Sequence, residues 1–391
     1  MKKLFLFLTI TVSTAFSAQT LIQAYQKRAN QITQTNIDTY LAEFASYGIK
    51  STGSTNNNNA FNWLKNKYLA FGYSESQISE NAFSYNGNTT KNLILTKTGT
   101  TYPNTYVIVC AHYDTIGGPG VNDNGSGTAV LLEMARILKD VPTEYSIKFI
   151  NFTGEEQGLR GSQNYVSTVV NATNPKMNIK LVFNIDQVGG VAGKVNNKIN
   201  CERDTNNSPS TNNEASAAVT QELMNCVSLY STLQPNLSYA YASDYMPFQA
   251  NNEVITGFYE YTESTKPHTS GDTLANMDPT FVFNVAKAAL GAVQHFSVAD
   301  LTFLSAADCP PEKMLSSLKI FPNPTSTTLF IDLLNLNLRD FSFTISDFNG
   351  KTLLKKQNEK VIDVSQLPNG VYLGTLQVED QYKTQKIVVQ K

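Results

Sequence analysis

The chain has 391 residues, of which 41% are hydrophobic and 16% are charged. This length exceeds one average domain, so we expect one large domain and a smaller one. The formal net charge of −2 argues against the strongly basic surface that nucleic-acid binding requires, and we predict no nucleic-acid partner.

The first 18 residues have the features of a secretory signal peptide. Two lysines precede an apolar run from Leu4 to Val12, and small residues follow as far as Ala18. No later segment approaches about 18 uninterrupted apolar residues, so no transmembrane segment is predicted. We therefore expect an exported protein.

Residues 19–300 are expected to form one α/β domain. Helical spacing covers 21–48 and 60–73, and the asparagine run at 56–59 between them is expected to be a loop. Apolar strands then alternate with helices. Strands are expected at 92–99, 106–114, 145–152, 179–186 and 253–261, and helices at 127–138, 158–170, 214–233 and 279–296. Ser126 is the expected N-cap of the helix at 127–138, and 192–213 is expected to be a polar insertion.

The texture of the sequence changes after residue 300. Residues 301–317 are expected to be a linker, and 318–391 contain short alternating strands separated by turns such as "FNGK" and "LPNG". We expect these strands at 328–333, 341–348, 351–356, 371–378 and 383–390. This part is predicted to be a small antiparallel all-β sandwich.

The chain has four cysteines, at positions 110, 201, 226 and 309. Export would permit a disulfide, and Cys201 with Cys226 is the expected pair. Cys110 is expected to be a small buried hydrophobe. No CxxC spacing occurs, so a zinc site made of thiolates is not expected.

Acidic side chains and histidines recur where the predicted strands end. Ligands of open α/β sheets bind at the carboxyl ends of the strands, and imidazole and carboxylate groups are zinc ligands. Histidine is scarce, with three in the whole chain. The candidates at strand ends or in the loops after them are His112, Asp114, Asp123, Glu155, Glu156, Asp186 and His268.

Several motifs resemble, in order, those of the co-catalytic two-zinc aminopeptidases, a group that includes bacterial leucyl aminopeptidases. These motifs are "AHYDT", "GVNDNGSGT", "TGEEQGLRGS", "NIDQVG" and "PHTSGDT". The resemblance covers roughly residues 30–296. It implies a three-layer αβα sandwich with a mixed, mostly parallel central sheet.

The resemblance also implies two zinc ions per chain. One ion would be held by His112, Asp123 and Asp186, and the other by His268, Asp123 and Glu156, so that Asp123 bridges them. Two ions close together can lower the pKa of a shared water and polarise a carbonyl.

Two further residues gain catalytic roles from this arrangement. Glu155 would take a proton from the attacking water and pass it to the leaving amine. Asp114 would accept a hydrogen bond from the second ring nitrogen of His112 and fix its tautomer.

Two positions depart from the family pattern. Asn124 stands where many relatives carry a second aspartate. Tyr245 replaces the histidine of the Ser-Asp-His-x-x-Phe segment, here "SDYMPF". In this segment Asp244, Met246 and Phe248 are candidates for the substrate pocket, with core packing the equal alternative.

Residues 318–391 carry a second resemblance. "LKIFPNPTSTTLFIDL" and "GVYLGTLQVEDQYKTQKIVVQK" resemble the sorting domain of type IX secretion cargo. This implies the type IX secretion machinery as a partner, passage through the outer membrane, and a secreted or cell-surface location.

Together these features predict a secreted aminopeptidase that acts on the N-termini of peptides or proteins. Three alternatives remain open: a glutaminyl cyclase with one zinc, a carboxypeptidase of the same fold, and an inert surface binding module. A carboxypeptidase needs a basic group for the substrate carboxylate, for which Arg160 and Arg203 are candidates.

Overall fold

The computed structural model describes residues 19–204, 208–301, 319–332, 341–348, 350–378 and 381–391. The chain forms two compact units, Met1–Ala299 and Asp300–Lys391. The predicted signal peptide, most of the predicted linker and Cys309 lie outside the described residues. Among the residues described, no helix is long and apolar enough to cross a membrane.

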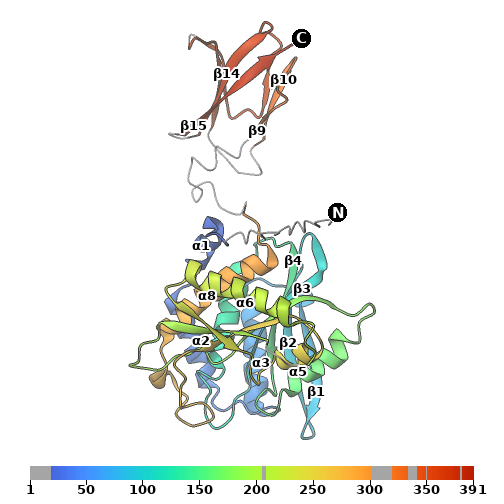
Figure 1. The fold of residues 1–391 in the computed structure, drawn as a ribbon, viewed down its shortest axis with the longest axis vertical. Coiled ribbons are helices and arrows are strands. Elements are labelled where there is room, and N and C mark those ends of the chain that lie inside the picture. Colours follow the sequence, from blue (N-terminus) through green and yellow to red (C-terminus); the bar gives the residue numbers. More distant parts are fainter. Residues whose placement is uncertain (1–18, 205–207, 302–318, 333–340, 349, 379–380) are drawn as a thin grey trace, which may run out of the picture. The chain divides into compact units, whose positions relative to one another are not determined.

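The first unit is built on a mixed sheet of eight strands in the order β1-β2-β4-β3-β5-β8-β6-β7 (Figure 1). Its centre is parallel, because β3 pairs in parallel with β4 and β5, and β5 pairs in parallel with β8. The strands are β1 (Ile78–Tyr85), β2 (Asn88–Lys97), β3 (Tyr102–His112), β4 (Tyr145–Phe152), β5 (Asn178–Ile185), β6 (Lys198–Arg203), β7 (Gln234–Tyr239) and β8 (Ile255–Glu260).

Helices cover both faces of this sheet (Figure 1). On one face α8 packs against α1, α2, α4 and α6, and on the other α5 packs against α7. The helices are α1 (Gln23–Ala29), α2 (Gln34–Ser46), α3 (Thr55–Ala70), α4 (Gly125–Leu138), α5 (Arg160–Tyr165), α6 (Asn213–Tyr230), α7 (Met246–Ala250) and α8 (Pro279–Ser297). The described residues also include the short 3-10 helices η1 (Glu75–Gln77) and η3 (Leu274–Asn276) and the π-helix η2 (Val166–Val170). The predicted αβα sandwich is confirmed.

The strand β3 shows why the sheet needs helices on both sides. Residues 107–111 of this strand are all fully buried. Ile108 and Cys110 pack in the cluster that contains Tyr165 and Phe248 from α5 and α7. Their neighbours in sequence point to the opposite face, because side chains alternate along a strand. The strand ends at His112, which this core therefore holds in a fixed position.

Two predicted loops are regular structure. The asparagine run at 56–59 forms the first turns of α3, because the Ser54 hydroxyl accepts from the Asn57 amide and caps the helix. The predicted insertion at 192–213 contains β6, in which Ile199 and Cys201 alternate with less buried residues. The alternation of buried and less buried residues is short, and its charged members make the strand difficult to recognise in the sequence.

The expected N-cap of α4 is wrong by two residues. The Asn124 side chain accepts a hydrogen bond from the Gly127 amide at 2.8 Å and caps the helix. The Ser126 hydroxyl instead donates to the Asn122 carbonyl at 2.6 Å. A Gly-rich sequence allows several starting points, and the packing of the preceding loop selects one.

The expected disulfide between Cys201 and Cys226 is not formed. Both are free, buried thiols, Cys201 in β6 and Cys226 in α6. The sequence suggested that both lie in one polar insertion. In the structure they belong to a buried strand and a packed helix. Cys110 is a buried free thiol, as expected.

The second unit consists of two antiparallel sheets, of orders β13-β10-β9 and β12-β11-β14-β15. Residues from both sheets, including Leu329, Phe343 and Ile387, share one apolar cluster. The strands are β9 (Lys319–Phe321), β10 (Thr328–Asp332), β11 (Ser342–Ser346), β12 (Thr352–Gln357), β13 (Val361–Asp363), β14 (Gly370–Val378) and β15 (Gln381–Val389). The predicted all-β unit is confirmed.

Candidate functional site

Each of the four central parallel strands is followed, after its carboxyl end, by residues of one acid–histidine cluster. The strands β4, β3, β5 and β8 are neighbours in the sheet, so the segments that follow them meet at one edge. His112 ends β3, Asp186 follows β5, and Glu156 lies in the turn after β4. His268 comes from the loop after β8, and Asp123 from the loop between β3 and α4.

Asp123 stands between the two histidines. Its Oδ1 lies 3.1 Å from His112 Nε2, and its Oδ2 lies 3.1 Å from His268 Nε2. His112 Nε2 also lies 3.2 Å from Asp186 Oδ1, and His268 Nε2 lies 2.9 Å from Glu156 Oε2. The five side chains therefore form two groups of three that share one carboxylate.

The spacing of these atoms fits donors around metal ions. Zinc–nitrogen and zinc–oxygen distances of about 2.0–2.2 Å put neighbouring donors of a tetrahedral site about 3.3 Å apart. The ligand atoms in each group lie within 4.8 Å of one another. Glu156 Oε1 is buried without a hydrogen-bond partner among the described residues. A buried unsatisfied carboxylate oxygen is costly without a cation nearby.

Asp114 supports the cluster in a different way from the one predicted. The Nδ1 of His112 lies 3.1 Å from the backbone carbonyl oxygen of Asp114 and 3.7 Å from its Oδ1. An N–H donated to that carbonyl leaves Nε2 free as a ligand. The carboxylate itself accepts from the Glu155 and Glu156 amides, each at 3.3 Å, and from the Thr52 hydroxyl at 3.1 Å. Asp114 thus fixes the turn that carries the paired glutamates.

Glu155 is half-buried beside the cluster but belongs to neither group of three. Burial raises the pKa of Glu155 to about 10, and the charges of Asp186 and Asp244 act in the same direction while His112 opposes them. Its backbone is held at the cluster, because the Glu155 amide donates to Asp114 Oδ1 and the next residue, Glu156, belongs to one of the two groups. The adjacent glutamates therefore have different environments.

The electrostatics of the other members reflect their pairing. Burial disfavours charge on Asp123, yet hydrogen bonds from His112 and His268 hold the pKa of Asp123 well below its usual range. The hydrogen bond that His268 donates to Asp123 raises the pKa of His268 to about 9. Burial, followed by the charge of Asp123, raises the pKa of Glu156 to about 8. Acids outnumber bases here, and the site favours cations.

Ser243 is a supporting residue that the sequence did not reveal. Its hydroxyl donates to Asp186 Oδ2 at 2.6 Å and accepts from the side-chain Nδ2 of Asn184 at 2.8 Å. The side chain of Asp186 is therefore oriented from behind. A serine in the "SDYMPF" segment carries no sequence signal for this role.

The departure at Tyr245 is structural. The Tyr245 ring is buried, and its hydroxyl donates to Glu202 Oε2 at 2.7 Å and accepts from the Tyr241 amide at 2.8 Å. Phe248 packs in the core cluster and Met246 packs against it. Asp244 is fully buried, and neither carboxylate oxygen has a hydrogen-bond partner among the described residues. Of the three pocket candidates, Phe248 therefore lies in the core.

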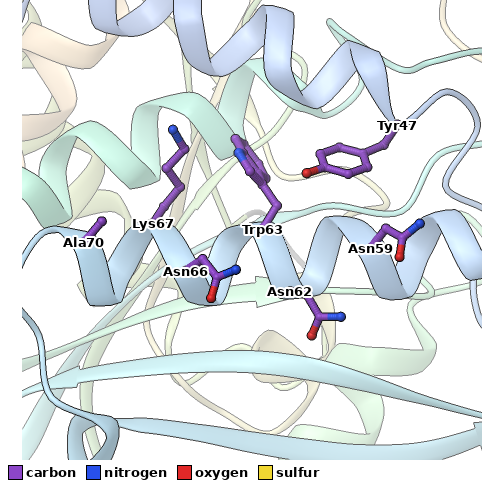
Figure 2. A pocket seen from close by; sticks show the side chains of 7 residues that line it. All are labelled: Tyr47, Asn59, Asn62, Trp63, Asn66, Lys67 and Ala70. Atoms are coloured by element: carbon purple, nitrogen blue, oxygen red, sulfur yellow. The ribbon is translucent and has the colours of Figure 1, made fainter.

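A separate surface pocket of about 430 Å³ lies beside α3 (Figure 2). The Trp63 indole N–H and the Lys67 ammonium are both bound to Glu43, at 2.7 and 2.6 Å. The lining residues are Tyr47, Asn59, Asn62, Trp63, Asn66, Lys67 and Ala70. None of them belongs to the acid–histidine cluster.

The fold and the cluster define a class: α/β proteins whose central parallel strands end in a site able to hold two metal ions. The family follows from comparison with known proteins. The model of peptidase family M28 matches residues 92–293, just over half of the chain, and the chain belongs to this family. Residues 319–390 match the secretion system C-terminal sorting domain.

Individual relatives match shorter stretches. Over 84 residues the chain is 50% identical to the aminopeptidase YwaD of Bacillus subtilis (strain 168), covering 21% of this chain and 18% of that protein. Over 191 residues it is 31% identical to a probable zinc metalloprotease of Pyrenophora teres f. teres (strain 0-1), covering 42% and 40%. The chain thus spans less than half the length of these curated relatives.

A solved structure extends the likeness of the fold. The LapA aminopeptidase of Legionella pneumophila superposes with a TM-score of 0.61 at 20% identity, covering 76% of this chain and 80% of that one. At this level of identity the likeness concerns the fold alone.

Proposed function

We propose that this protein is a zinc-dependent aminopeptidase that removes N-terminal residues from peptides. The observation that carries the proposal is the position of Asp123, which presents one carboxylate oxygen to each of two histidines, at 3.1 Å in both cases. Family membership and the printed names of the two curated relatives support the same activity.

Two zinc ions are the proposed cofactor. His112, Asp123 and Asp186 would hold one ion, and Asp123, Glu156 and His268 the other. Zinc, when bound, would polarise the carbonyl of the scissile bond and lower the pKa of water. The unpaired Glu156 Oε1 and the acidic surplus of the cluster support divalent cations here.

Glu155 is the proposed general base. Its backbone is bound to Asp114 beside Glu156, and it belongs to neither ligand group, so its carboxylate is free to accept a proton from the attacking water and to deliver it to the leaving amine. A nearby divalent charge would favour the ionised form of this carboxyl and offset the effect of burial. Asp114 holds the backbone of Glu155 and so aims the side chain.

The charge of the site favours an aminopeptidase over a carboxypeptidase. An acidic surplus attracts the protonated α-amine of a substrate and repels a C-terminal carboxylate. Of the two candidates for holding that carboxylate, Arg160 is exposed on α5. The Arg203 guanidinium lies 5.7 Å from the centre of the Tyr239 ring, in cation–π contact. Arg203 Nε is buried without a hydrogen-bond partner among the described residues, but neither arginine belongs to the acid–histidine cluster.

A glutaminyl cyclase is the remaining enzymatic alternative, and the number of metal positions separates the two. Such an enzyme uses one zinc and releases ammonia, whereas the two ligand groups that share Asp123 favour two ions. The complete ligand set together with a separate Glu155 also argues against an inert binding module.

The domain assignment follows the same proposal. Residues 1–18 would be the signal peptide, 19–300 the catalytic domain, 301–317 the linker and 318–391 the sorting domain. The match of residues 319–390 to the sorting-domain model supports delivery by the type IX secretion machinery to the medium or the cell surface. Fractionation of producing cells should place activity outside the outer membrane. Activity retained in the cytoplasm would count against this assignment.

A substrate panel tests the activity directly. The purified full chain should hydrolyse aminoacyl anilides to the free amino acid and the aniline, and N-acetylation of the same substrates should abolish this reaction because the free α-amine is lost. Metal analysis of the same sample should give two zinc ions per chain. Ammonia release from N-terminal glutamine with one zinc would instead establish the cyclase.

A further inference from the structure

The loop of residues 115–123 carries Asp123 and lies against the segment that carries His268. A Cβ at Gly117 would collide with the His268 carbonyl oxygen, and one at Gly118 would collide with the Thr269 carbonyl oxygen. The two backbones are therefore in direct contact, which only glycine permits. A shift of this loop would move both Asp123 and the backbone of His268.

One end of the loop is anchored by Asp272. This buried carboxylate accepts from the Asn122 amide at 2.7 Å and from the Asp123 amide at 3.0 Å. Asp272 comes from the same segment as His268, four residues later in the sequence. The segment that supplies one proposed ligand thus also fixes the backbone of the shared one.

The middle of the loop is anchored by Lys50, whose side chain is fully buried. Its Nζ donates to the carbonyl oxygens of Pro119 at 2.7 Å, Gly48 at 2.8 Å and Phe44 at 3.3 Å. An ammonium has three donors, and here each has one acceptor. The Phe44 ring lies 3.8 Å from Nζ and adds a cation–π contact.

Keeping this ammonium buried is costly. The acceptors of Lys50 Nζ among the described residues are backbone carbonyl oxygens and not carboxylates, and a buried charge without a counter-ion is unfavourable. Burial lowers the pKa of Lys50 to about 7, with Asp272 and then Asp114 acting in the opposite direction. Two of its acceptors, Phe44 and Gly48, lie at the carboxyl end of α2, where the helix dipole favours a cation.

We propose that Lys50 is a positioning residue for the metal centre: its ammonium ties the end of α2 to the Pro119 carbonyl and thereby holds the loop of residues 115–123, with Asp123, in place. This inference rests on the proposed function. It assigns a role to the segment before residue 92, which lies outside the match to the family model. The acceptors of its ammonium are Phe44, Gly48 and Pro119, none of which is a proposed metal ligand, so Lys50 acts through the loop.

Lys50→Met is the test, because methionine is unbranched and of similar volume but has no donor. Lys97→Met is the matched control: Lys97 is 6% exposed on β2, and its Nζ contacts Thr143 and not the loop. Zinc affinity of the full chain is measured by competition with a chelator, together with the absorption spectrum of the Co²⁺-substituted protein. Thermal unfolding of the metal-free proteins reports stability separately.

Lys50→Met should bind zinc about 10–100-fold more weakly than the wild type, the range for residues that support metal ligands. Its Co²⁺ spectrum should change, while the control keeps both properties. Wild-type affinity and spectrum in Lys50→Met would overturn the inference and leave the proposed function standing. Wild-type protein that binds no zinc would overturn both.

Asp272→Asn provides a second test that does not depend on the folding of the lysine variant. The amide keeps the shape of the side chain, but it has one acceptor oxygen for the two backbone N–H groups of residues 122 and 123. It should also weaken zinc binding and alter the Co²⁺ spectrum. Unchanged affinity in Asp272→Asn would show that the position of the loop does not control the site.

Discussion

The two units of the chain place polar groups in opposite ways. The first unit buries His112, Asp114, Asp123 and Asp272 at one edge of its sheet and holds them with hydrogen bonds. The core cluster of the second unit is apolar, and its buried polar residues among those described are Thr325 and Ser342. All three histidines of the chain lie in the first unit. Buried polar and charged side chains thus mark the unit that contains the candidate metal site.

The largest expected effect comes from Glu155→Gln. The amide keeps the size of the side chain but cannot accept the proton, so turnover should fall about 10²–10⁴-fold. Zinc content should stay at the wild-type value, because Glu155 is not among the proposed ligands. Steady-state kinetics and metal analysis on one sample check both statements. Glu155→Gln with wild-type turnover would remove Glu155 as the base.

The shared carboxylate gives the next effect. Asp123→Ala should lose zinc from both positions, since each ligand group would keep only two members. Asp278→Ala is the matched control, because Asp278 caps α8 and lies outside the cluster; it should cost about 1 kcal/mol of stability and keep both ions. Unchanged zinc content in Asp123→Ala would refute the bridging role.

A core substitution in the second unit should affect stability and not chemistry. Phe343 is fully buried in the apolar cluster, and Phe343→Ala should destabilise this unit by about 3–5 kcal/mol. Turnover and zinc content of the full chain should not change. Phe348→Ala is the control, because that ring is 67% exposed, and should have little effect. Loss of zinc in Phe343→Ala would show that zinc binding in the first unit depends on the stability of the second.

The smallest expected effect is a dependence of stability on pH. Burial lowers the pKa of His295 to about 4 from its ordinary value of 6.5. Its ring faces Tyr230, whose hydroxyl lies 2.7 Å from Nε2, and Tyr25. The unfolded state therefore binds a proton more readily than the folded state, and the stability present above pH 6.5 is lost as the pH falls towards 4.

His295→Gln checks this prediction, because glutamine can still hydrogen-bond to Tyr230 but does not titrate. Its unfolding free energy in denaturant should vary less between pH 6.5 and pH 4.5 than that of the wild type. The second unit has no histidine, so its own unfolding should not acquire this component. An equal loss in both proteins would mean that His295 does not contribute.

Topology predicts the candidates, and the resemblance to two-zinc aminopeptidases implies their grouping into ligand sets. Once β3, β4, β5 and β8 are parallel neighbours, the residues that follow them must meet. The supporting contacts were not predictable in this way. Lys50 acts on backbone carbonyls, which leave no pattern in the sequence, and Ser243 resembles any serine in a loop.

Errors in the fold have the same origin. The strand β6 is hard to predict because its positions other than Ile199 and Cys201 are charged or polar, and the helical turn at 56–59 because asparagine usually favours loops. The expected disulfide between Cys201 and Cys226 followed from export and from their positions in the sequence. Neither shows that one cysteine lies in a strand and the other in a helix. In each case the surrounding packing outweighs the local preference.

The most direct test of the metal centre is anomalous diffraction at the zinc edge from crystals of the full chain. The account predicts two zinc peaks about 3.5–4 Å apart, with Asp123 giving one oxygen to each and Glu155 bound to neither. A single peak, or two peaks that Asp123 does not join, would contradict it.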